Sequence, residues 1–229
     1  MPAFPSISTS IDAFNRANEG PPMTGWTDLI AGLKVVSNEC AGNSATDNWS
    51  SLNVIIAAIP DFDLFMTVVV KPATGGILAL YTIDPDVNGY ALSFTVDAGA
   101  DVWKLNRLDA AVSTQLGASM TQELAAGEKI GFRRLGNDME AYYYNGSTWA
   151  LVGTRTDSTY AEERRNLIAV YIHNTLARLD DLSGGRIPQS VELTGTALSG
   201  LTEADIVAGG KTIILTVNGD RFIPSTIVG

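Results

Sequence analysis

Four aromatic side chains and one arginine form the clearest chemical pattern in this sequence. Trp103, Tyr142, Tyr144 and Trp149 lie in or beside segments with strand-like alternation, and Arg107 follows Trp103 at even spacing. Sugar binding needs flat aromatic faces beside polar groups, because a pyranose presents both C–H surfaces and hydroxyls. These five residues form the predicted glycan-binding set. The alternative is that the rings pack in the core or against a sheet face.

The stretch 140–144 indicates which of these rings share a face. Successive side chains of a strand point to opposite sides of a sheet. Glu140, Tyr142 and Tyr144 therefore lie on one face, which we expect to be the wetter one. Arg133, on a neighbouring predicted strand, is a second candidate polar partner and can equally be a solvated side chain.

Strand-like segments follow one another along the chain, separated by turn residues, and no stretch has a helical period of useful length. The strongest is Leu167–His173, an alternating apolar run expected as a central strand, with residues 177–182 as the next strand. Even spacing of short strands predicts an all-β fold, an antiparallel two-sheet sandwich. The other predicted strands are 33–36, 52–58, 64–71, 77–82, 90–97, 102–108, 112–116, 120–124, 128–135, 139–144 and 148–152. We expect a polar loop at 40–51 and a helical turn at 160–165.

The pattern divides the chain into an arm, a sandwich and a C-terminal segment. Residues 1–10 form a Pro- and Ser-rich arm without periodicity, which is either disordered or ordered by a neighbour. Residues 11–185 form the sandwich. Residues 186–229 hold only a few short strands, too few to bury a core alone. This segment packs on the sandwich, pairs with another chain, or begins a larger domain.

Composition excludes several classes of function. The formal net charge is −10 and the pI is about 4.5, which argues against binding to nucleic acid and to anionic membranes. The apolar runs have strand length, so we expect no membrane insertion, and the N-terminus has no secretory signal pattern. The single cysteine, Cys40, allows no intrachain disulfide and is expected as a buried thiol.

Several motifs resemble a known family. The stretches DAFNRAN at 12–18, GW at 25–26, VVSN at 35–38 and ARLDDLSGG at 177–185 resemble concanavalin A-like (laminin-G-like) jelly-roll modules of bacteriophage and bacterial surface proteins. The resemblance covers roughly residues 11–185 and implies a jelly-roll sandwich.

The C-terminal segment carries a second resemblance. Residues 195–216 resemble the first strands of a module that recurs in phage structural proteins, in which more chain normally follows. Together the two resemblances imply a virion component, such as a tail, fibre or head-decoration protein. They imply an extracellular particle as its location and other virion subunits as partners, in a homo-oligomer.

The same resemblance raises the question of a metal. Jelly rolls of this kind often hold a structural Ca²⁺ with carboxylate and carbonyl oxygens. Asp12, Asp180 and Asp181 meet if the first and last strands are neighbours, and they are the predicted structural calcium site. The alternative is that Asp181 caps a turn or pairs with Arg16 or Arg178. No other cofactor is expected.

Catalysis lacks a recognisable motif. Glycosidases with this fold often carry Glu-x-Asp-x-x-Glu on one strand face, and this sequence contains no such spacing. Glu162 and Glu163 are adjacent, so on a strand they would point to opposite faces. His173, within an apolar strand, is expected as a structural histidine. We therefore expect a protein that is not an enzyme.

Three functions remain, in this order. The first is a non-enzymatic phage virion structural protein whose jelly roll mediates subunit or host-surface interaction. The second is a glycan-binding adhesin or carbohydrate-binding module with a host surface glycan as partner. The third, a glycoside hydrolase, ranks last because its motif is absent.

Overall fold

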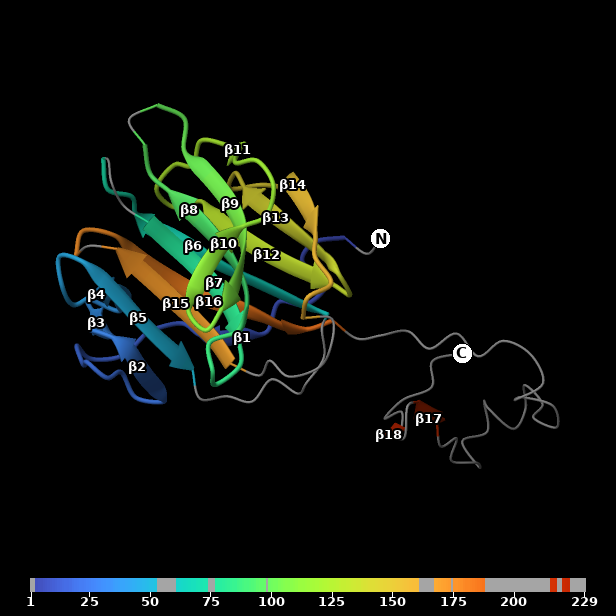
Figure 1. The fold of residues 1–229 in the computed structure, drawn as a ribbon. Helices are drawn as coiled ribbons and strands as arrows, with labels where there is room; N and C mark the ends of the chain where they lie inside the picture. Colours follow the sequence, from blue (N-terminus) through green and yellow to red (C-terminus); the bar gives the residue numbers. More distant parts are fainter. Residues whose placement is uncertain are drawn as a thin grey trace, which may run out of the picture. The chain divides into compact units, whose positions relative to one another are not determined.

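The computed structural model of the chain describes residues 3–52, 61–73, 77–97, 99–160, 167–173, 175–187, 215–217 and 220–222. The chain divides into two compact units, Met1–Ile187 and Pro188–Gly229, which are described separately. In its described residues the first unit is built from β-strands packed as two antiparallel sheets, so the predicted all-β sandwich is confirmed (Figure 1).

Sheet A contains the first and the last strand of the sandwich in chain order. Its strands are β1 (Ser10–Asp12), β3 (Leu33–Val36), β4 (Glu39–Gly42), β6 (Phe62–Val70), β12 (Lys129–Leu135), β13 (Asp138–Tyr144), β14 (Trp149–Thr156) and β16 (Arg178–Arg186). The strand order is β14-β13-β12-β6-β16-β4-β3, and β1 pairs with β16. The first and last strands of the sandwich are therefore neighbours, which is the condition set for the predicted calcium site.

Sheet B faces sheet A across the core. Its strands are β2 (Trp26–Ile30), β5 (Asp47–Leu52), β7 (Ile77–Ile83), β8 (Gly89–Thr95), β9 (Val102–Asp109), β10 (Val112–Gln115), β11 (Met120–Thr121) and β15 (Leu167–His173). The strand order is β10-β9-β8-β7-β15-β5-β2, and β11 pairs with β9. The predicted central strand, β15, lies between β7 and β5.

Period-two alternation places the core between the sheets. Along β6, Leu64, Met66 and Val68 are fully buried in the main core cluster. Asp63 and Phe65 have the opposite parity and lie on the outer side of sheet A. The same rule gives each sheet an inner apolar face and an outer face on which function can be built.

The structure corrects one expected segment, and two others lie outside the described residues. Residues 40–51 are not a polar loop, because β4 and β5 occupy most of them and Trp49 lies on β5. The predicted strand 52–58 and the helical turn 160–165 fall almost wholly outside the described residues. Cys40 is fully buried, as predicted, and burial raises the pKa of its thiol.

In the second unit the structure describes one pair of strands. β17 (Leu215–Val217) and β18 (Asp220–Phe222) pair antiparallel, with Thr216 opposite Arg221. The strand expected at 191–196 lies outside the described residues. Within the described part of the whole chain, no helix has the length and apolar character needed to cross a membrane.

Candidate ligand-binding surfaces

The outer face of sheet A brings together three of the five predicted glycan residues. Tyr144 on β13 pairs in register with Trp149 on β14, and their ring centroids lie 5.1 Å apart. Tyr142 lies two residues earlier on β13 and shares their face. The Phe65 ring on β6 meets Trp149 edge-on at 5.5 Å. The sequence alternation thus predicted a real aromatic cluster on this face.

The N-terminal arm covers part of this cluster. The Phe4 ring stacks on Tyr142 with centroids 4.0 Å apart and an interplanar angle of 5°, and it meets Trp149 edge-on at 4.7 Å. Gly131 allows this approach, because a Cβ there would lie 2.6 Å from two Phe4 ring carbons and 2.9 Å from Trp149. The arm is therefore ordered by its own domain, because the apolar Phe4 side chain is buried on the sheet.

A buried ion pair lies beside the rings. Arg133 on β12 and Asp63 on β6 are fully buried, and Arg133 Nε and Nη2 donate to the Asp63 carboxylate at 2.7 and 3.0 Å. Arg133 Nη2 also donates to the arm, to Ala3 O at 3.0 Å and to Ser6 Oγ at 2.8 Å. The Ser6 backbone N–H donates to Asp63 Oδ2. Burial disfavours the charged guanidinium, but Asp63 outweighs burial and raises the pKa of Arg133.

Glu140 completes this surface and differs from expectation. It shares the outer face with Tyr142, but its side chain is almost fully buried. Tyr142 Oη donates to Glu140 Oε2 at 2.6 Å, and burial together with Glu140 raises the pKa of Tyr142 to about 12. We call this surface the arm face. It comprises Asp63, Phe65, Gly131, Arg133, Glu140, Tyr142, Tyr144 and Trp149, with arm residues 3–9 upon them.

Trp103 is not part of any exposed surface. Its ring is fully buried in the core, edge-on to Phe94 at 5.1 Å, and its indole N–H donates to Gln122 O at 2.7 Å. A ring without an exposed face cannot stack on a sugar. The prediction of Trp103 as a glycan platform is therefore wrong, and the alternative of core packing holds.

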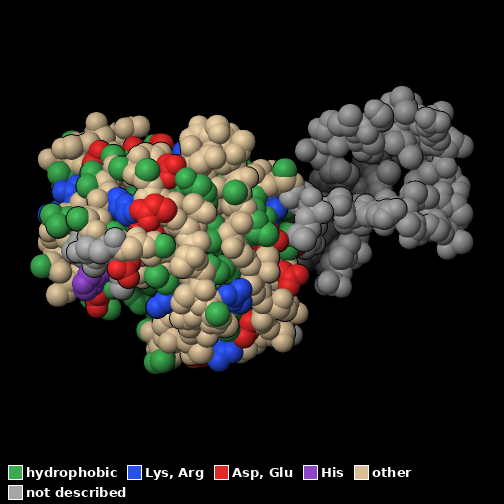
Figure 2. Space-filling view, turned by 90° about the horizontal axis from the view of Figure 1, so that it is seen from above, with side chains coloured by type: hydrophobic (Ala, Val, Ile, Leu, Met, Phe, Trp, Pro, Cys, Tyr) green, Lys and Arg blue, Asp and Glu red, His purple; other side chains and the backbone are tan. Residues whose placement is uncertain are grey.

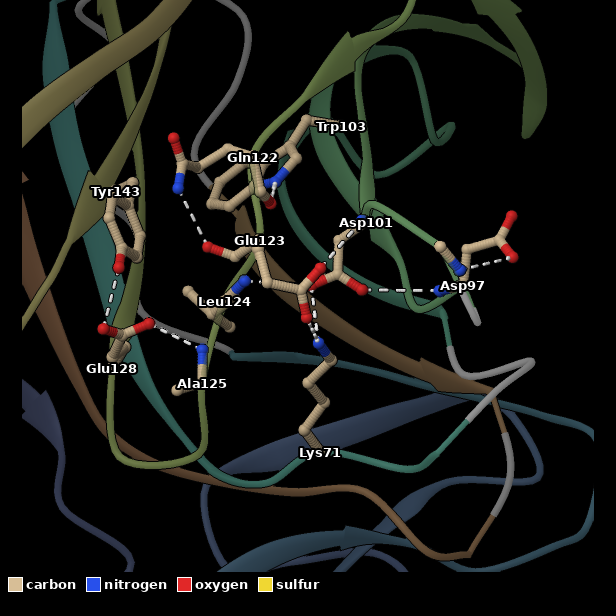
Figure 3. A network of polar contacts seen from close by, with 11 residues as sticks. Lys71, Asp97, Asp101, Trp103, Gln122, Glu123, Leu124, Ala125, Glu128 and Tyr143 are labelled. Carbon is tan, nitrogen blue, oxygen red and sulfur yellow. Dashed lines mark hydrogen bonds and ion pairs between the residues drawn. The ribbon is translucent and has the colours of Figure 1, made fainter.

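A polar network fastens the segment that closes over Trp103 (Figure 3). Lys71 Nζ bridges the carboxylates of Asp101 and Glu123, at 2.7 Å from Asp101 Oδ2. The fully buried Asp101 also accepts the backbone N–H of Leu124 at 2.9 Å. This network stabilises the chain that follows β11 and has a structural role.

Arg107 is engaged at one end of sheet B. Its guanidinium donates to Asp109 at 3.0 Å, to Asp157 at 3.1 Å and to Thr159 at 3.0 Å. These partners hold Arg107 away from the aromatic cluster of sheet A. The structure therefore does not bring Arg107 together with Tyr142, and Arg133 is the arginine beside the rings.

The outer face of sheet B carries a second aromatic cluster. Trp49 on β5 and Tyr81 on β7 have ring centroids 5.0 Å apart, and the Tyr81 and Tyr171 rings are 6.5 Å apart. Small side chains lie between them, with Ala169 opposite Tyr81 and Ala79 opposite Tyr171 in the register. We call this surface the Trp49 face. It comprises Asp47, Trp49, Ala79, Tyr81, Ala91, Ser93, Lys104, Asn106, Ala169, Tyr171 and His173.

Polar groups with capacity for a ligand border these rings. Asp47 accepts a hydrogen bond from Tyr171 Oη at 2.5 Å and lies 2.8 Å from His173 Nδ1. These contacts lower the pKa of Asp47, and burial with the Asp47 hydrogen bond raises the pKa of Tyr171. The Asp47 and His173 side chains remain 51% and 36% exposed, and the histidine is visible beside acidic side chains in Figure 2.

One donor on the Trp49 face has no acceptor. Trp49 is only 7% exposed, and its Nε1 is one of two buried side-chain atoms that lack a hydrogen-bond partner in the described part of the chain. Buried donors are nearly always paired, since an unpaired one costs about 1–3 kcal/mol. The indole N–H is therefore an unsatisfied donor that lies beneath the surface of this face.

Sequence reasoning missed the Trp49 face for two reasons. The sequence predicts a loop at Trp49 and a structural role for His173. The available signal was the two-residue spacing along each strand. Trp49 and Asp47 point to the same face of β5, and Tyr171 and His173 point to the same face of β15. Only the pairing of β5 with β15 brings these four side chains together.

The predicted calcium residues do not form a metal site here. Asp12 lies near Asp180, as expected, but its carboxylate accepts from Arg16 Nη1 at 2.7 Å and from Trp26 Nε1 at 2.9 Å. Asp181 Oδ2 accepts from Thr67. Among the described residues, no three His, Cys, Asp or Glu side chains are grouped to hold a metal ion. A cation at Asp12 would have to displace a paired arginine, so these residues do not fit Ca²⁺.

Comparison with solved structures shows the fold. The chain is similar to the carbohydrate-binding module CBM66 from Bacillus subtilis, with 18% identity and a TM-score of 0.56 over 71% of this chain and 96% of that chain. It is also similar to the CBM2 module of the evolved Dit of Lactobacillus casei BL23 phage J-1, with 12% identity and a TM-score of 0.57 over 81% and 99% of the two chains. No protein-family model and no curated protein sequence matches the chain.

A third similar structure is a domain solved with bound ligands. The exoplasmic/lumenal domain of VIP36, in its Ca²⁺/Man3GlcNAc-bound form, matches with 10% identity and a TM-score of 0.55 over 88% of this chain and 95% of that chain. At such identities the likeness shows the fold alone. The fold is the concanavalin A-like jelly roll that the sequence motifs resemble.

Proposed function

We propose that this protein is a non-catalytic carbohydrate-binding module and that its Trp49 face binds the glycan. The observation that carries the proposal is the pair of partly exposed Tyr81 and Tyr171 rings, with the buried Trp49 packed beside Tyr81, next to the exposed Asp47–His173 pair. A pyranose needs an apolar ring surface for its C–H groups and polar groups for its hydroxyls. This face supplies both on strands of a rigid sheet.

The polar and the small side chains of the Trp49 face have separate roles in this proposal. The Asp47 carboxylate accepts hydrogen bonds from sugar hydroxyls, since it retains free acceptor capacity on its exposed side. The small Ala79 and Ala169 side chains are fully buried between the rings. The solved structures of similar fold include carbohydrate-binding modules, which supports the choice of ligand class.

A glycan array tests this function, followed by titration of the best ligand. Asp47→Asn and Tyr171→Phe are expected to lower affinity about tenfold each, which corresponds to about 1.4 kcal/mol. Tyr143→Phe is the matched control, because it also removes a phenol hydroxyl bonded to a carboxylate, that of Glu128. An array without hits contradicts the function. So does hydrolysis of a bound polysaccharide that depends on one carboxylate.

The setting of the function is a second part of the proposal. We infer that the module belongs to a phage virion, in a homo-oligomer that attaches the particle to a host surface. Support comes from the similar module of a phage Dit and from the phage-like motif at 195–216. Light scattering of the full chain is expected to show a trimer or larger assembly. A stable monomer would remove the oligomer from the proposal.

A further inference from the structure

The chain's own N-terminal arm occupies the arm face. The arm supplies an aromatic ring and hydrogen-bonding groups in the arrangement that a ligand of suitable shape would use. Phe4 lies parallel on Tyr142 at 4.0 Å, which is the stacking position for any flat ring. Ala3 and Ser6 take hydrogen bonds from the buried Arg133.

Removal of the arm takes some of the contacts from three groups. Tyr142 loses the ring on its face, Arg133 Nη2 loses two acceptors, and Asp63 Oδ2 loses the Ser6 N–H. Arg133 and Asp63 still hold each other, so the site keeps its shape. A stacking ring beside a fork of donors and a carboxylate acceptor matches a ring with adjacent hydroxyl groups.

The contacts of the arm are concentrated in a few residues. Phe4 is buried, whereas Ala3, Ser6, Ser8 and Thr9 are exposed. Beyond the Ser6 contacts, the backbone N–H of Gly184 donates to Thr9 O at 2.8 Å and holds the far end of the arm. Phe4 is the buried apolar anchor of this segment, and Pro5 and Ile7 are partly buried beside it. A competing ligand at the Tyr142 ring has to displace Phe4 and its nearby hydrogen bonds.

Charge selects the class of ligand. Arg133 carries one positive charge, and Asp63 and Glu140 carry two negative charges within the same site. A site with this balance does not attract an anionic sugar. We therefore propose that the arm face is a second binding site, for neutral pyranosides with adjacent hydroxyls, and that Phe4 keeps it closed by occupying the sugar position. The proposal shares only the ligand class with the proposed function of the Trp49 face.

The test separates the two surfaces by weakening the Trp49 face. In an Asp47→Asn background, Phe4→Ser removes the anchor ring, and Ser8→Ala serves as the control in the same exposed arm. The probes are immobilised neutral oligosaccharides of glucose, galactose and mannose. Phe4→Ser is expected to bind at least about tenfold more tightly than the background, and Ser8→Ala is expected to match the background.

Two further variants connect any gain to the stacking ring. The gain is expected to persist in Phe4→Ser with Tyr142→Phe, which keeps the ring, and to vanish in Phe4→Ser with Tyr142→Ala. A gain that survives Tyr142→Ala overturns the proposal. Binding by Phe4→Ser equal to that of the background also overturns it.

Hydrogen exchange on the unaltered protein gives a test that does not depend on a variant. Saturation with an oligosaccharide that binds the Phe4→Ser variant is expected to increase exchange of the Ser6 amide, because the sugar displaces the arm. Unchanged protection overturns the proposal. If the unaltered protein binds, Asp47→Asn loses that binding and Phe4→Ser adds none, this inference alone is overturned. If neither the unaltered protein nor any variant binds, both proposals are overturned.

Discussion

The two outer faces of the sandwich use similar residues in opposite ways. On the arm face, the charged groups are buried and paired, and an aromatic ring from the arm lies over the platform. On the Trp49 face, the carboxylate and imidazole are exposed, and a buried indole N–H has no acceptor in the described part of the chain. Aromatic residues on a sheet therefore do not define a binding site by themselves. The site depends on whether the polar groups around them are already satisfied.

The largest expected difference between the faces concerns their charges. Arg133→Leu leaves the buried Asp63 carboxylate without its partner, so we expect a loss of about 3–5 kcal/mol in the free energy of unfolding. His173→Gln on the Trp49 face breaks an exposed pair and is expected to cost less than about 1 kcal/mol. Urea denaturation measures both.

A double variant serves as the control for this comparison. Asp63→Leu combined with Arg133→Leu removes both charges and is expected to recover part of the stability, since no unpaired charge then remains. Equal losses of stability for Arg133→Leu and His173→Gln would contradict the distinction between a buried and an exposed ion pair.

The anchor of the arm gives the next largest effect. Phe4 is 9% exposed, and Phe4→Ala removes most of its buried ring, so we expect a loss of about 2 kcal/mol. Thermal unfolding measures this, and Ser8→Ala is expected to stay within about 0.5 kcal/mol of the unaltered protein. An unchanged melting temperature in Phe4→Ala would mean that the arm contributes nothing to the stability of the fold.

The two tryptophans test the unpaired donor. Trp49→Phe removes an N–H without an acceptor, which offsets the lost packing, so we expect a change below about 1 kcal/mol. Trp103→Phe removes an N–H that donates to Gln122 O and is expected to cost about 1–3 kcal/mol more. Chemical denaturation of Trp49→Phe and Trp103→Phe measures both losses of stability. Equal losses would argue that the Trp49 N–H has an acceptor in solution.

The smallest expected effect is a dependence on pH. Tyr171 and His173 lower the pKa of Asp47 in the folded state, so the Asp47 carboxylate contributes stability at pH 5 and above. This contribution is lost as the pH falls below about 4 and through the folded pKa. Asp47→Asn is therefore expected to be slightly less stable than the unaltered protein at pH 6 and equal to it once the pH lies well below the folded pKa of Asp47. A difference that persists at the lower pH would exclude this carboxylate as the cause.

Part of the candidate site followed from the sequence. Alternation alone placed Glu140, Tyr142 and Tyr144 on one outer face, and the strand after the next turn brought Trp149 opposite Tyr144. These contacts are local, because β13 and β14 are joined by a short turn. Trp103 had the same alternation but lies on the inner face, and parity cannot tell which face of a strand is inside.

Local sequence was also enough for the class of fold. Period-two alternation between turn residues specifies strands. With few charged residues and many turns, two sheets packed face to face are the arrangement that buries one face of each strand. The order of strands, the seat of Phe4 over Gly131 and the pairing of Asp47 with His173 came only from the tertiary structure. These contacts join residues more than a hundred positions apart, and no local pattern encodes which distant strand or arm will cover a given face.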